Sequence, residues 1–139
     1  MIELDNRTSL EIDENFLNKL LKNFTDKEVE LIITSNEEIK EINAAQRDIS
    51  KPTDVLSFPY EEMPMSPLGS IVISENFVRE KALEFGHTEH EELTLLFIHG
   101  LLHLLGFDHE VDNGEMREEE ERIIKKLTLP SSLIVRTQG

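Results

Sequence analysis

The chain of 139 residues is long enough for about one domain with its own hydrophobic core. It has no cysteine, which excludes disulfides, and its formal net charge of −15 argues against nonspecific attraction to nucleic acids or anionic membranes. A polyanionic substrate must therefore be held by a local basic site or by a metal ion.

The sequence predicts neither an export signal nor a membrane helix. Its first residues, MIELDNRTSLEIDENF, are acidic where a signal peptide has a basic and then an apolar region. The longest apolar stretch, 93–107, is interrupted by Thr94, His99 and His103 and falls short of the roughly 20 residues that a membrane helix needs. We expect a soluble, cytoplasmic protein.

The first third of the chain alternates between strand and helix patterns. Residues 1–4 alternate weakly as a strand, and residues 13–24 place apolar side chains at helical spacing. The β-branched run 28–35 predicts a second strand. Ser35 and Glu38 then form a predicted capping box that begins a helix over 36–47.

Two further strands and two further helices follow. Residues 54–60 and 69–74 have strand character, and the prolines between them indicate a loop. Ser74 begins a predicted helix that Gly86 ends. A second predicted capping box, Thr88 with Glu91, begins the apolar helix that leads into HGLLHLLGFDH at 99–109.

We predict a single α/β domain over 1–139 with about four strands in a small mixed sheet and about five helices. Mixed strand direction is expected because strands 54–60 and 69–74 have no helix between them. Residues 128–139 are expected to form either a flexible tail or a segment that docks on the domain or on a partner. The acidic run 115–122 is predicted to be the exposed face of an amphipathic last helix whose apolar side is Met116, Ile123, Ile124 and Leu127.

Three histidines lie within eleven residues of the apolar helix and its end. His99 and His103 are four residues apart, so they share one face of a helix and can bind one ion. Gly106 can adopt the left-handed conformation that ends a helix, which can bring His109 back toward the same ion. The alternative is an ordinary helix with core or surface histidines.

Burial favours the metal site, since a buried imidazole must be hydrogen-bonded or coordinated. Three neutral nitrogen ligands that leave one position open for water are typical of catalytic centres. Imidazole suits zinc, and copper, nickel and iron are also compatible. The spacing HxxxHxxGxxH is also that of metzincin proteases, but their general base directly follows the first histidine, where this chain has Gly100. The motif therefore predicts a metal-dependent hydrolase that acts on another substrate.

Three segments together resemble the YbeY family of bacterial endoribonucleases and ribosomal RNA maturation factors. HGLLHLLGFDH is similar to the family motif HGxLHLxGxDH. Asn43, Arg47 and PTDVLSF at 52–58 are similar to a second family block, and LGSIVIS is similar to the usual LGDIVIS, with Ser70 in place of the acidic residue. The resemblance covers the chain as far as Leu127.

The resemblance implies a small four-stranded mixed sheet surrounded by helices, and one metal ion, usually taken as Zn²⁺, on His99, His103 and His109. It further implies cleavage of single-stranded RNA, a role in maturing the 3′ end of small-subunit (16S) ribosomal RNA, and a role in ribosome quality control. The expected partners are therefore ribosomal RNA and the ribosome or its proteins. Neither DNA nor a membrane is an expected partner.

Two further residues are candidates for catalysis. Arg47 maps onto the family's arginine and could clamp a phosphate in bidentate fashion, although an arginine after a helix is otherwise a common surface residue. Asp108 could orient a histidine or act as a base, and the alternative is local backbone capping. Asp54 is expected to order the turn before its strand, and His87 and His90 are expected to be solvated.

Two other classes of function stay open. A metzincin-like metalloprotease shares the ligand spacing but lacks the glutamate. A noncatalytic ribosome-assembly factor would keep the fold and some affinity for RNA, with a purely structural metal. Cleavage of RNA with and without a chelator, beside a casein control, separates the three.

Overall fold

The computed structural model describes residues 1–61, 63, 65–107, 113–127 and 129. Within them the chain forms four strands and five helices. In order these are β1 (Ile2–Asn6), α1 (Glu14–Lys22), β2 (Val29–Thr34), α2 (Asn36–Arg47), β3 (Val55–Pro59), β4 (Gly69–Ser74), α3 (Glu75–Phe85), α4 (Glu89–Leu104) and α5 (Glu115–Lys126). The predicted α/β domain with a small mixed sheet is confirmed.

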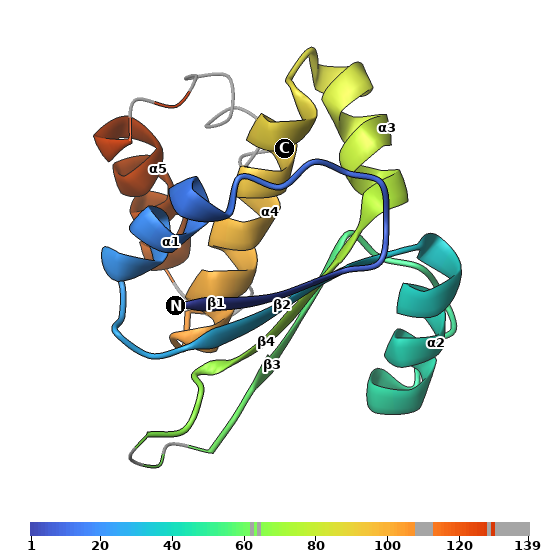
Figure 1. The fold of residues 1–139 in the computed structure, drawn as a ribbon, viewed down its shortest axis with the longest axis horizontal. Coiled ribbons are helices and arrows are strands. Elements are labelled where there is room, and N and C mark those ends of the chain that lie inside the picture. Colours follow the sequence, from blue (N-terminus) through green and yellow to red (C-terminus); the bar gives the residue numbers. More distant parts are fainter. Residues whose placement is uncertain (62, 64, 108–112, 128, 130–139) are drawn as a thin grey trace.

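The strands form one sheet in the order β1-β2-β4-β3 (Figure 1). Strands β1, β2 and β4 are parallel, and β3 is an antiparallel edge strand beside β4. The expected mixture of directions is confirmed, and its cause is the short connection between β3 and β4, which has no crossover helix. In Figure 1 this hairpin projects from the lower left of the sheet.

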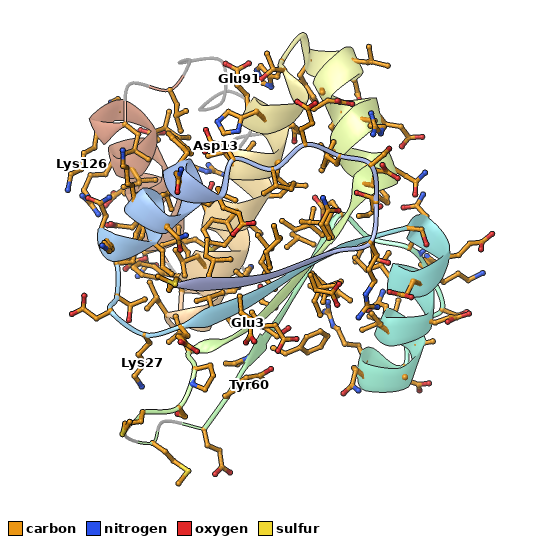
Figure 2. The ribbon with its side chains drawn as sticks, in the orientation of Figure 1. Glu3, Asp13, Lys27, Tyr60, Glu91 and Lys126 are labelled. Atoms are coloured by element: carbon orange, nitrogen blue, oxygen red, sulfur yellow. The ribbon has the colours of Figure 1, made fainter. Side chains whose placement is uncertain are left out.

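Helices cover both faces of the sheet. Figure 1 shows α1, α4 and α5 on one side and α2 on the other. Side chains alternate along β4 accordingly: Ile71 and Ile73 join the large core with α1, α4 and α5, and Val72 joins a smaller cluster with Ile39 of α2 and Leu56 of β3. The side chains drawn in Figure 2 fill the space between the sheet and α4.

Helix α4 is the centre of the large core. Ten of its side chains and its one glycine are buried: Glu92, Leu93, Thr94, Leu95, Leu96, Phe97, Ile98, Gly100, Leu101, Leu102 and Leu104. The predicted capping box of Thr88 and Glu91 is present at its start. Just beyond its end, Gly106 has a φ of +97°, the left-handed conformation expected there. None of the described helices, α4 included, has the length and apolar character needed to cross a bilayer.

The capping box predicted at the start of α2 is only half present. The Ser35 side chain caps the helix by accepting from the Glu38 backbone N–H. The Glu38 carboxylate is engaged elsewhere, because it accepts from the Thr34 hydroxyl at 2.7 Å and pairs with Arg7. The Thr34 hydrogen bond first, and the Arg7 contact second, lower the pKa of Glu38.

Two other predictions concern the tail 128–139 and the apolar side of α5. The predicted tail 128–139 lies, apart from Leu129, outside the described residues. Leu129 packs partly buried against Leu95 and Ile124, and its backbone N–H donates to the Ile124 carbonyl at 3.0 Å. On α5 the predicted apolar side is confirmed by the burial of Met116, Ile123 and Ile124.

Candidate metal centre

Two of the three predicted metal ligands lie side by side on α4. The Nε2 atoms of His99 and His103 are 3.2 Å apart. Their rings meet edge to face, with centroids separated by 4.8 Å. This is the arrangement that the four-residue spacing predicts, because such side chains stack one turn apart on a helix. The third predicted ligand, His109, and the candidate catalytic Asp108 lie outside the described residues.

A carboxylate from α5 holds the first of these histidines. Glu120 Oε1 lies 2.9 Å from His99 Nδ1, and the Glu120 side chain is 5% exposed against 31% for His99. The prediction that the acidic run 115–122 is an exposed face is therefore wrong at Glu120. The signal was present in the sequence, because Glu120 is four residues after Met116 and four before Ile124, on the apolar side of the helix.

The histidine pair fits a metal ion. At the zinc–nitrogen distance of about 2.0–2.1 Å, two nitrogens of a tetrahedral site are about 3.3 Å apart, close to the separation seen here. With Glu120 at its Nδ1, His99 has the carboxylate–histidine pairing that commonly supports metal ligands. Within the described residues no three His, Cys, Asp or Glu side chains gather as a complete ligand set. A three-ligand centre on this helix thus requires a donor such as His109.

Gly100, which follows the first histidine, faces the sheet. A Cβ at this position would lie 2.9 Å from Ile71 Cγ2 and 3.1 Å from Ser57 Oγ. The Gly100 carbonyl accepts a hydrogen bond from the Ser57 hydroxyl at 3.0 Å. Close packing of α4 on β3 and β4 thus explains the glycine. A glutamate here, as in metzincins, would point into the sheet and away from the histidine pair.

Arg47 lies away from the histidine pair. It is the exposed last residue of α2, the helix on the opposite face of the sheet from α4. Its guanidinium has no hydrogen bond or ion pair with any described residue, whereas Arg7, Arg79 and Arg122 are each paired with carboxylates. Arg47 is therefore available for an external anion, and the segment that follows it leads to the edge strand β3.

Other residues of the second family block have structural contacts. Asn43 is buried and donates from Nδ2 to the Lys51 carbonyl at 2.9 Å, which fixes the turn after α2. Asp54 accepts from the Val55 backbone N–H at 2.8 Å, and this confirms its expected role in ordering the turn. Ser70, where the family usually has an acidic residue, is buried on β4 opposite Phe58.

Of the two histidines near the start of α4, His87 is not solvated as expected, and His90 is only partly so. The His87 side chain is 3% exposed, and its Nδ1 lies 3.5 Å from Oε1 of the fully buried Glu92. His90 is half-buried and packs edge to face on Phe16 of α1, at 5.0 Å between centroids. The sequence gives no sign of these contacts, because they depend on the turn between α3 and α4 and on the position of α1.

The fold and the paired imidazoles define a class, that of single-domain α/β proteins with a candidate metal centre on a buried helix. The model of the Endoribonuclease YbeY family matches residues 2–128. The chain is 63% identical to Endoribonuclease YbeY of Sulfurimonas denitrificans, with both chains covered completely. It is 50% identical to that of Helicobacter pylori, with 99% of each chain covered.

A solved structure supports the same relationship. The solution structure of a Thermotoga maritima protein matches with a TM-score of 0.61 and 31% identity, covering 99% of this chain and 92% of that one. The chain therefore belongs to the YbeY family.

Proposed function

We propose that this protein is a zinc-dependent endoribonuclease that cleaves single-stranded RNA. We further propose that it acts in the cytoplasm, in 3′-end maturation of small-subunit ribosomal RNA and in ribosome quality control. The observation that carries the proposal is the His99–His103 pair with Glu120 behind it, in a chain whose relatives are named endoribonucleases.

The proposed ligands are His99, His103 and His109. A zinc ion bound there would act as a Lewis acid on a phosphodiester oxygen and lower the pKa of a bound water. His99 and His103 hold their donor nitrogens at the separation that one ion requires, and the buried helix α4 keeps them there. Asp108 is proposed either to orient a histidine or to accept a proton.

Arg47 is the proposed anchor for an RNA phosphate. In a chain of net charge −15, an exposed guanidinium without a carboxylate partner among the described residues is suited to a phosphate. Since α2 and α4 cover opposite faces of the sheet, RNA that contacts both Arg47 and the histidines must extend around the sheet from one face to the other. The rest of the chain is acidic and does not attract RNA by charge. We therefore propose that the ribosome or its proteins deliver the RNA.

A peptidase is disfavoured by the position of Gly100, which leaves no room for a general base directly after the first histidine. A noncatalytic assembly factor with a structural metal should behave differently from an enzyme. We expect such a factor to bind RNA with and without the metal and to cleave RNA in neither state.

The decisive assay uses untagged protein with a labelled single-stranded RNA, a duplex RNA, a single-stranded DNA and casein. We expect cleavage of the single-stranded RNA alone, its loss with a chelator and its return with added zinc. RNA binding without cleavage in every metal state would establish the noncatalytic alternative, and casein cleavage would establish the peptidase. In cells, depletion should cause small-subunit ribosomal RNA with unprocessed 3′ ends to accumulate.

A further inference from the structure

Helix α5 carries five glutamates, and one of them differs from the others in its environment. Glu120 is the only buried acid of the helix, whose other buried residues are Met116, Ile123 and Ile124. Burial of a carboxylate costs several kcal/mol unless partners compensate for the lost water. Its contact with His99 Nδ1 at 2.9 Å joins α5 to α4 across 21 positions of sequence.

We propose that Glu120 is a positioning residue for the metal centre, which acts by fixing the tautomer and orientation of His99. The inference rests on the proposed metal centre at His99, His103 and His109. In this role Glu120 acts through His99, whose Nδ1 it contacts and whose Nε2 is the proposed donor atom.

The tautomer follows from hydrogen-bond chemistry. A neutral imidazole has one N–H and one lone pair, and an ionised carboxylate can only accept. With Glu120 at Nδ1, the proton of neutral His99 resides on Nδ1 and the lone pair resides on Nε2. That lone pair faces the Nε2 of His103, in the space that an ion would occupy. The negative charge at Nδ1 also makes His99 a stronger donor toward a cation.

The contact also joins two helices, because His99 lies on α4 and Glu120 lies on α5. A purely structural contact would contribute to stability alone, whereas a positioning contact also changes the zinc affinity of the folded protein.

Glu120→Gln tests this distinction, because glutamine has nearly the same shape but no charge. Glu118→Gln is the matched control, since Glu118 is exposed on the same helix. Zinc affinity is measured by competition with a chromogenic chelator on folded, untagged protein. We expect Glu120→Gln to bind zinc about 10–100-fold more weakly and Glu118→Gln to bind like the wild type.

A second measurement needs no variant and stands even where Glu120→Gln fails to fold. Nitrogen-15 spectra of the zinc-free wild type in mildly alkaline buffer should show the His99 proton on Nδ1. Equal zinc affinity of wild type and folded Glu120→Gln, or a proton on Nε2, would overturn the positioning role alone. If the wild type takes up no zinc, the proposed metal centre fails and the positioning role fails with it.

Discussion

Two histidine–glutamate pairs involve helix α4, one at its start and one toward its end. At the start, His87 Nδ1 and Glu92 Oε1 are 3.5 Å apart, and the two side chains are 3% and 0% exposed. Toward the end, His99 Nδ1 and Glu120 Oε1 are 2.9 Å apart, and the His99 side chain is 31% exposed. The Nε2 atom of a second imidazole, His103, lies 3.2 Å from His99 Nε2. The contacts described for His87 include no second imidazole.

The difference shows that residue type alone does not define a metal site. Both pairs join an imidazole to a carboxylate that is removed from water. The side chains of the His87–Glu92 pair have almost no exposed surface and belong to the packing around the α3–α4 turn. The half-open His99 has a carboxylate on one ring nitrogen and an imidazole facing the other, which is the arrangement of a metal ligand.

Removal of both histidines of the open pair should have the largest effect. The double variant His99→Ala, His103→Ala should lose at least about 100-fold in RNA cleavage, since Lewis-acid catalysis contributes several kcal/mol. His87→Ala should cleave RNA like the wild type. Rates on a labelled single-stranded RNA measure both variants. Equal losses in the two would remove the functional distinction between the pairs.

Arg47, the proposed anchor on the opposite face of the sheet, should matter less than the proposed metal ligands. Arg47→Glu should lower cleavage by about 10–100-fold, because a charge-assisted hydrogen bond contributes about 1.5–3 kcal/mol. Arg47→Lys should fall between, since it keeps the charge and loses the planar fork. Metal content and the unfolding midpoint should stay unchanged. Normal cleavage by Arg47→Glu would place the anchor elsewhere, and loss of folding would make Arg47 structural.

The enclosed pair should affect stability and not zinc. His87→Ala removes the imidazole beside a fully buried carboxylate, so the free energy of unfolding should fall by about 1–3 kcal/mol. Denaturant unfolding of zinc-free protein measures this loss, and chelator competition measures zinc affinity. A weaker zinc affinity in His87→Ala would show that the two pairs are coupled along α4.

Gly100→Ala should have the smallest effect of the four. Alanine favours a helix over glycine by about 1 kcal/mol. The added Cβ would lie 2.9 Å from Ile71 Cγ2, and such overpacking costs about 1–3 kcal/mol. We expect a net loss of about 1 kcal/mol in denaturant unfolding, with zinc affinity retained. A gain in stability would mean that α4 can move away from the sheet.

The periodic features of the fold were predictable from the sequence. The capping residues Ser35, Ser74 and Thr88 and the left-handed Gly86 and Gly106 all act over a few residues. The same holds for the His99–His103 pair, because a helix fixes the relation of residues four apart.

The contacts between distant elements were not predictable in this way. Glu120 meets His99 only because α5 packs on α4, and Glu38 reaches Arg7 because β1 and β2 are neighbours in the sheet. In both cases a charged residue resembled a surface residue in the sequence, and its partner came from another segment.

Metal content measures the central claim most directly. Untagged wild type and the double variant His99→Ala, His103→Ala are purified side by side and analysed for zinc and other transition metals by elemental analysis. The wild type should contain about one ion per chain, and the folded double variant should contain essentially none. A metal-free wild type that takes up no added zinc, or full metal retention in the double variant, would contradict the metal centre.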